Sequence, residues 1–363
     1  MRHFSFSLSL FYRRYAMTTV YVREQGAKLQ RRGERLVVSK QGKVIEEFPM
    51  NQVNQVVLMG NVQITTQTMV GLVQRQVDVA FLSSYGKFRL RLEADTSGHV
   101  QLRQKQLQEK DNGSLALPVA KAIVDAKIHN QRVILQRQVR RLETGGRQPV
   151  YVRDQGLFDR SLRGMMQMQQ QAQHVDNLDS LRGYEGKAAA YYFDAMRSML
   201  ARDWGFDRRD YHPPPDPFNA LLSFAYSLLL KDVRAAVNLV GLDVYMGFFH
   251  EVQSGRPSLA LDLMEEWRPL LSDALCLELV NRGVLRPESF VRTNDPRRPI
   301  ELGEEGVAIV LEAYGSRLST RLYHPLAGPG GETSLQQAIV LQARRLARVI
   351  AGVEAMYEGM RAK

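Results

Sequence analysis

The chain has 363 residues, of which 44% are hydrophobic, so the composition is typical of a globular protein and excludes an intrinsically disordered one. No run of about 18 uncharged apolar residues is present, so we expect no membrane span. The formal net charge is +11, and of the 49 basic residues 11 are lysine and 38 are arginine. This excess favours a nucleic-acid partner, because arginine binds phosphate bidentately, although a GC-rich genome would also favour arginine codons.

Cys276 is the single cysteine of the chain. It excludes an internal disulfide and a zinc site built from several cysteines, and it fits a reducing compartment, so we expect a cytoplasmic protein. Residues 1–16 form an extension that carries no chemistry. They are either a disordered arm or sequence upstream of a natural start at Met17, since Arg13 and Arg14 follow the apolar stretch instead of preceding it as in a signal peptide.

Residues 17–96 predict a small β-rich domain. Two alternating stretches separated by Gln41-Gly42 have the pattern of a β-hairpin. Exposed strand edges near Val20 and Val37 are surfaces that can pair with a second chain. The predicted strands are Thr19–Val22, Arg35–Lys40, Lys43–Phe48, Val53–Met59, Val77–Leu82 and Phe88–Ala94, with one short helix over Thr65–Arg75.

After a predicted linker at residues 97–104, residues 105–363 have a helical periodicity near 3.6 and predict a larger all-α domain. The fold class is therefore α+β, with two domains. Pro269 lies inside one helical pattern and should kink or split that helix. The predicted helices are Leu115–Leu142, Leu157–Gln173, Ser180–Met199, Pro217–Lys231, Ser258–Arg282, Gly303–Thr320 and Ser334–Met360.

Three places in the helical region carry residues suited to a metal site. Glu185 precedes an alanine-rich stretch, His250 ends an apolar run, and Asp262 and Glu265 are spaced to share one helix face. Two carboxylates with a histidine and a further glutamate suit Mg²⁺ or Mn²⁺. Taken singly, each fits a structural role better: a first-turn acid for Glu185, an interior residue for His250, and a solvated acidic face for the last pair.

Two basic groups are candidates for phosphate contacts. Arg208 and Arg209 precede a run of prolines, and Arg344 and Arg348 are i,i+4 neighbours on the last predicted helix. A solvated helix face is an equally good interpretation of the second pair.

Several motifs in order give the chain a family resemblance from Met17 to about Gly352. It resembles the CRISPR adaptation integrases, the family called Cas-one. The residues that carry the resemblance are Thr19–Val22 with Gln25-Gly26, Gly183–Ala189, Pro215–Leu229, Gly247–His250, Leu261–Pro269 and Gln342–Ala347.

The resemblance implies a β-sandwich-like N-terminal domain, which joins a homodimer, and a helical catalytic domain with one divalent-metal site. It assigns Glu185, His250 and Glu265 as ligands of Mg²⁺ or Mn²⁺, with Asp262 assisting. It further implies insertion of captured DNA duplexes into a CRISPR array, by attack of a 3′-hydroxyl on a phosphodiester, in a complex with the small protein Cas-two. Two alternatives remain open: a non-catalytic nucleic-acid scaffold, and a metal-dependent nuclease acting on RNA or branched DNA.

Overall fold

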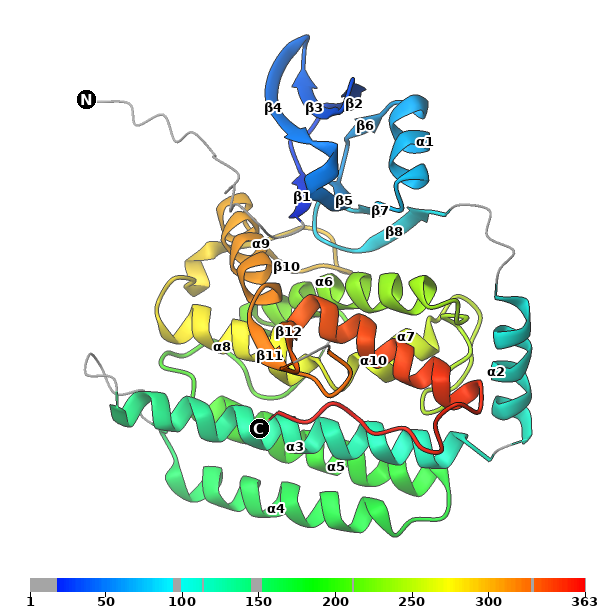
Figure 1. The fold of residues 1–363 in the computed structure, drawn as a ribbon. Coiled ribbons are helices and arrows are strands. Elements are labelled where there is room, and N and C mark those ends of the chain that lie inside the picture. The colour runs from blue at the N-terminus through cyan, green and yellow to red at the C-terminus, as the bar shows by residue number, and fades with distance from the viewer. Residues whose placement is uncertain are drawn as a thin grey trace. The chain divides into compact units, whose positions relative to one another are not determined.

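The computed structural model describes residues 18–93, 99–112, 114–144, 152–210, 212–327 and 330–362 (Figure 1). Contacts divide the chain into two units. The first comprises the described residues up to Ser84 and those from Arg89 to Glu93, and the second comprises Tyr85–Phe88 and the described residues from His99 onward. The predicted extension at residues 1–16 lies outside the described residues.

The first unit contains two four-stranded sheets. One sheet has its first three strands parallel, and the other is mostly antiparallel with a parallel pairing between β2 and β6. In sheet order, the strands of the first sheet are β1 (Thr18–Val22), β5 (Val53–Met59), β7 (Asp78–Leu82) and β8 (Phe88–Leu92). Those of the second are β4 (Lys43–Pro49), β3 (Arg35–Lys40), β2 (Lys28–Arg32) and β6 (Gln63–Ile64).

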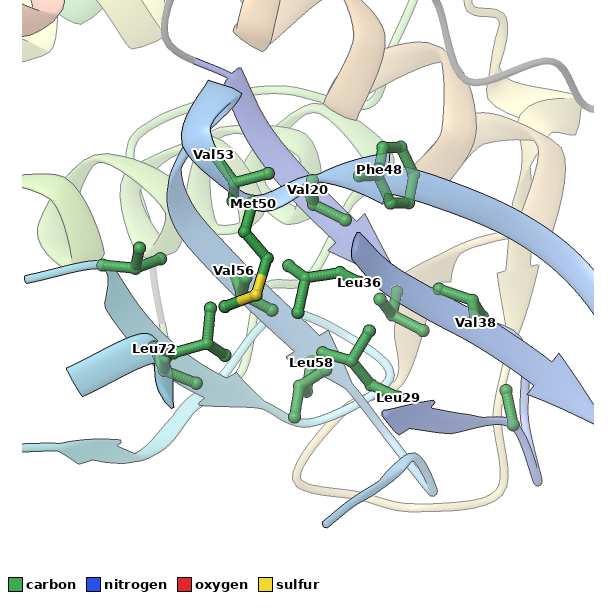
Figure 2. Close-up of a cluster of buried hydrophobic side chains, with 14 residues drawn as sticks. Val20, Leu29, Leu36, Val38, Phe48, Met50, Val53, Val56, Leu58 and Leu72 are labelled. Atoms are coloured by element: carbon green, nitrogen blue, oxygen red, sulfur yellow. The ribbon is translucent and has the colours of Figure 1, made fainter. Parts of the chain in front are cut away.

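Both sheets contribute side chains to one apolar core, which makes the unit a sandwich (Figure 2). Val56 and Leu58 come from one sheet, Leu29 and Leu36 from the other, and Leu72 from helix α1 (Thr66–Gln74). All five are at most 1% exposed, so the alternation of apolar residues along these strands is satisfied by packing. The β-rich domain is therefore confirmed.

The predicted hairpin is confirmed, but one predicted edge is wrong. Gln41 and Gly42 have φ angles of 50° and 80°, the left-handed values that a tight two-residue turn requires. Strand β1 with Val20 is an edge strand, whereas Val37 lies in β3 between β4 and β2. The prediction failed there because the sequence pattern of β2, with only Leu29 fully buried among polar residues, did not reveal a strand.

The second unit is mainly helical, and most predicted helices are present with shifted ends. Strands β9 (Phe290–Arg292) and β10 (Ile300–Leu302) form one short ribbon, and β11 (Arg321–Tyr323) and β12 (Glu332–Ser334) another. The helices are α2 (Val100–Asn112), α3 (Ala116–Thr144), α4 (Gln155–Gln173), α5 (Leu178–Ser198), α6 (Pro217–Leu239), α7 (Ser258–Met264), α8 (Ala274–Asn281), α9 (Glu304–Leu318) and α10 (Leu335–Ile350).

Three details of the predicted organisation are corrected. The predicted linker at 97–104 is helical from Val100, where α2 begins. The predicted all-α domain contains the two short ribbons, whose strands are too short to leave a clear alternation. The last helix ends at Ile350 and not at Met360, because Gly352 follows with φ 80°, a helix-terminating conformation.

The helix predicted over Ser258–Arg282 is divided at Pro269, as expected. Between α7 and α8 lies a π-helical segment, η2 (Arg268–Asp273), with Pro269 as its second residue. Proline lacks the N–H group that a continuous α-helix would use at that point. Along the described residues, no helix is both long and apolar enough to cross a membrane.

Candidate active site

Lys127 connects two of the predicted ligands. Its ammonium on α3 donates a hydrogen bond to Glu185 Oε1 on α5 and lies 2.6 Å from Glu265 Oε2, just after α7. The side chains of Lys127 and Glu265 are 9% and 4% exposed, so these charges meet with little water between them. The structure thus brings Glu185 and Glu265 to one positive centre, although 80 residues of sequence separate them.

Glu185 is not a first-turn acid. Helix α5 begins at Leu178, and its first-turn acid is Asp179, which leaves Glu185 without a helix-dipole role. Gly183 and Gly186 on either side are exposed, and a Cβ on either would meet nothing within 4 Å. The two glycines therefore leave an open surface beside the Glu185 carboxylate.

Asp262 fixes the loop that carries His250. Its carboxylate accepts backbone N–H groups from Phe248, Phe249 and His250 at 2.6, 2.9 and 2.8 Å. The Asp262 side chain is fully buried on α7. Both of its oxygens are therefore engaged in holding backbone, which makes Asp262 a positioning residue here.

Asp262 also sets the orientation of the His250 ring. His250 Nδ1 lies 2.7 Å from Asp262 Oδ1, and because a carboxylate accepts, Nδ1–H is the donor. Nε2 consequently faces the other way and lies 3.8 Å from Glu265 Oε1. A carboxylate that holds one ring nitrogen so that the other can bind a metal is a common arrangement at histidine ligands.

Gly247 permits the loop to lie this close to α7. A Cβ built there would be 2.7 Å from the backbone carbonyl carbon of Ser258 and 2.8 Å from Asp262 Oδ2. Real Cβ atoms do not approach other heavy atoms so closely, so only glycine fits this position without moving the helix.

Positive charge governs the ionisation of Glu265. Burial would raise the pKa of Glu265, but Arg268, Lys127 and His250 outweigh it and lower this pKa to about 2. Arg268 contributes from 3.4 Å, and its guanidinium also lies 4.7 Å from the centre of the Tyr226 ring. Glu265 is therefore an anion at neutral pH, the form that binds cations.

A second buried cluster lies on the other side of Tyr226. Tyr226 and Tyr192 donate hydrogen bonds of 2.6 and 2.9 Å to the two oxygens of Asp273. Burial raises the pKa of Asp273 to about 6, against the opposing effect of these hydrogen bonds and of Arg268. The cluster joins α5, α6 and the end of η2 behind the Glu265 site.

Carboxylates and imidazole are the kinds of group that divalent cations bind. Two carboxylates, one on α5 and one just after α7, converge on one ammonium ion, and an imidazole nitrogen is directed at the second carboxylate. The Lys127 ammonium supplies the positive charge that neutralises these two carboxylates. Among the described residues, no three histidine, cysteine, aspartate or glutamate side chains lie close enough together to hold a metal ion.

Comparisons with known proteins give the family of the chain. The family model for CRISPR associated protein Cas1 matches residues 20–316. The CRISPR-associated endonuclease Cas1 2 of Rhodospirillum rubrum is 35% identical over 343 residues, covering 93% of this chain and 96% of its own. The chain belongs to the Cas1 family. This confirms the resemblance to the integrases called Cas-one.

Solved structures share the fold of this Cas1-family chain. A casposase bound to integration product is 20% identical with a TM-score of 0.76, and the match covers 96% of both chains. A Cas6-RT-Cas1–Cas2 complex contains a chain that is 22% identical with a TM-score of 0.76, covering 95% of this chain and 36% of that one. The order of a β-rich region followed by a helical domain is thus the fold of the family.

Three residues of this Cas1-family site were not assigned from sequence: Lys127, Arg268 and Arg182. Arg182 on α5 donates to the carbonyl oxygen of Phe249 at 2.8 Å and so ties the helix of Glu185 to the loop of His250. The sequence did contain an indication that Lys127 has a partner inside the protein. It falls in the buried stripe of α3 with Ile123, where a charged residue needs a partner.

The four predicted phosphate-binding arginines differ in their surroundings. Arg208 and Arg344 are exposed, and Arg348 is exposed but lies 2.6 Å from Glu354 Oε1. Arg209 donates inward to Asn219 Oδ1 and Ser223 Oγ at 2.7 and 3.0 Å, which engages its guanidinium within the protein. DNA contacts by Arg208, Arg344 and Arg348 stay predictions, and Arg209 is better placed to hold the start of α6.

Proposed function

We propose that this Cas1-family chain is a Mg²⁺- or Mn²⁺-dependent DNA endonuclease and integrase. In this role it inserts captured foreign DNA, the protospacers, into a CRISPR array for antiviral defence. The observation that carries the proposal is that Glu185 and Glu265 meet at the Lys127 ammonium, while the oriented His250 ring lies beside Glu265. The name of the relative, an endonuclease, and the fold shared with an integration-product complex support it.

The chemistry is a transesterification. The 3′-hydroxyl oxygen of the captured DNA bonds to a phosphorus of the repeat, the repeat's own 3′-oxygen leaves, and the hydroxyl proton passes to that oxygen through solvent. Glu185, Glu265 and His250 Nε2 would hold the metal, which when bound would polarise the phosphoryl oxygens. Asp262 keeps His250 Nε2 directed at the site, and Arg268 supplies fixed positive charge beside it.

The partners follow from the same proposal. The substrate is double-stranded DNA, both protospacer and repeat. A Cas2-type protein is the assembly partner, supported by the Cas1–Cas2 complex among the structural neighbours. We also propose a homodimer formed through the β-rich unit, where β1 offers an edge strand. Light scattering that finds only monomers at working concentration would contradict the homodimer.

A strand-transfer assay tests the proposal. It uses a supercoiled array plasmid, a short DNA duplex, the Cas2-type partner and Mn²⁺. Glu185→Gln, His250→Ala and Glu265→Gln should each abolish transfer, while duplex binding measured by fluorescence anisotropy is retained. Transfer at the wild-type rate by Glu185→Gln would overturn the assignment.

The two alternatives predict different results with the same variants. A non-catalytic scaffold would bind DNA but gain nothing from carboxylates next to its phosphates, since they repel the ligand. Mn²⁺ binding that disappears in Glu265→Gln excludes the scaffold. A nuclease for RNA would cleave RNA hairpins faster than branched DNA under matched conditions, so comparing the two substrates separates it from the integrase.

A further inference from the structure

The C-terminal residues 353–362, which we call the C-terminal strap, return beside the active-site helices. After α10 ends, the strap runs back along α3 without forming a helix or strand (Figure 1). A Cβ on Gly359 would lie 2.6 Å from Ala122 O and from the Ala126 Cβ of α3. The strap is thus packed directly on the helix that carries Lys127.

Two residues of the strap form hydrogen bonds to Glu266, the residue after the predicted ligand Glu265. Tyr357 Oη donates to Glu266 Oε1 at 2.5 Å, and the backbone N–H of Met360 donates to Glu266 Oε2 at 2.7 Å. Glu266 is 0% exposed, so its carboxylate has no water to replace these donors. Gln342 on α10 donates to Tyr357 Oη at 2.9 Å and fixes the hydroxyl from behind.

Asn130 also joins the strap to Glu266, through backbone groups of both. Its side-chain amide donates to the carbonyl oxygens of Glu266 and Met360 at 2.9 and 2.8 Å and accepts from the N–H of Ala362 at 2.8 Å. Asn130 lies three residues after Lys127 on α3, almost one turn away. The strap, α3 and the backbone of Glu266 are therefore joined by one buried amide.

We infer that the C-terminal strap is a positioning element for the active site and that Tyr357 is its key side chain. The strap holds both side-chain oxygens of Glu266, and Asn130, which is itself bonded to the strap, holds the Glu266 carbonyl. Together these contacts fix the backbone that directs Glu265 toward Lys127 and His250. The buried polar contacts oppose rotation of this segment about the end of α7, where helical hydrogen bonding is interrupted. Tyr357 acts through Glu265 and touches no reacting atom.

The test is Tyr357→Phe, which removes one hydroxyl and keeps the ring packed. It rests on the proposed metal site, so Mn²⁺ affinity is measured by calorimetry, and amide hydrogen exchange across residues 263–269 is measured without metal. We expect Mn²⁺ binding about tenfold weaker, as for other groups that support a ligand from behind. We also expect faster exchange at these amides, a lower kcat for strand transfer and an unchanged KM for DNA.

Arg361→Ala is the matched control. It removes the ion pair between the strap and Asp125 on α3 but leaves both donors to Glu266 in place. It should lower thermal stability without changing Mn²⁺ affinity. Deleting Tyr357–Lys363 should reproduce Tyr357→Phe with a larger effect.

The outcomes separate the two proposals. If Tyr357→Phe binds Mn²⁺ like the wild type and its exchange at residues 263–269 is unchanged, the positioning role is wrong, whatever happens to stability. If the wild type itself binds no Mn²⁺, the proposed function fails, while the exchange measured without metal still decides the role of the strap.

Discussion

The ammonium of Lys127 lies 2.6 Å from Oε2 of Glu265, in an environment where both side chains are nearly excluded from solvent. Such a pair is stable only because each charge compensates the other, and removing one partner of a buried pair typically costs about 3–5 kcal/mol. The burial of Lys127 would lower its pKa, yet Glu185 and Glu265 raise it above the ordinary value, so the ammonium keeps its proton. Lys127 therefore supplies positive charge to both Glu185 and Glu265.

Lys127→Met should destabilise the metal-free protein by about 3 kcal/mol, because Glu185 would lose its buried cation and Glu265 would keep only Arg268 and His250 beside it. Mn²⁺ should then raise the melting temperature more in this variant than in the wild type, since the ion no longer competes with an ammonium. Differential scanning fluorimetry with and without Mn²⁺ measures both effects. Lys121→Met, on the same helix but bonded to the carbonyl of Gln173, is the control and should respond to Mn²⁺ like the wild type.

Gly247→Ala should disrupt the His250 loop. The added Cβ would be 2.7 Å from the Ser258 backbone, so loop or helix must shift, at a cost of about 2 kcal/mol or more in unfolding free energy. Gly315→Ala in α9 meets nothing within 4 Å and should gain up to about 1 kcal/mol. Urea unfolding of both variants decides the point, and equal stabilities would contradict the close packing.

The stability of the protein should carry a pH dependence from Asp273. Its pKa is about 6 in the folded chain and 3.8 as a model value, so the folded state binds the proton more tightly. Protonation thus favours folding, and this contribution, about 3 kcal/mol, is present below pH 3.8 and is lost as pH rises to about 6.

Asp273→Asn should remove that contribution. The stability difference between wild type and variant should fall by about 3 kcal/mol between pH 4 and pH 7 and stay constant above. Burial also raises the pKa of Glu266, to about 8, which acts in the same direction in both proteins and cancels in the difference. Chemical denaturation at several pH values provides the test, and a difference independent of pH would refute it.

Arg344→Ala should weaken DNA binding and lower the slope of log K against log salt by about 0.9, the loss of one phosphate contact. Arg344 is exposed on α10. Arg348→Ala should have a smaller effect, because its guanidinium already lies 2.6 Å from Glu354. Fluorescence anisotropy across a salt series measures both slopes. Unchanged slopes in both variants would mean that this face of α10 does not contact phosphate.

The sequence predicted individual secondary-structure elements better than the way in which these elements pack against one another. The hairpin at Gln41-Gly42 and the break at Pro269 follow from local backbone chemistry, which is why both were found. The position of Lys127 between Glu185 and Glu265 depends on the packing of α3 against α5 and the end of α7, and no local pattern encodes that arrangement. The assignments of Glu185, His250 and Glu265 to a metal stay predictions, although Glu185 and Glu265 share one ammonium and His250 lies beside Glu265.

Other errors have equally specific causes. Strand β2 was missed because its residues are mostly polar. The dipole role considered for Glu185 was wrong because α5 begins earlier, at Leu178, where Asn177 caps it by accepting the N–H of Ser180. The inward contacts of Arg209 could not be foreseen, since an arginine next to prolines has the same local sequence whether it points to solvent or to Asn219.

The π-helical segment η2 changes the direction in which the side chains that follow it point. A π turn accommodates about one residue more than an α turn, so everything beyond it is rotated by roughly 100° relative to an uninterrupted helix. Glu265 precedes η2 and Asp273 ends it, and the two contact Lys127 and the tyrosine cluster respectively. Deleting a single residue within η2 would restore an even helical repeat and would disengage one carboxylate from its partners. The irregularity thus lets one continuous stretch of chain serve two buried clusters at once.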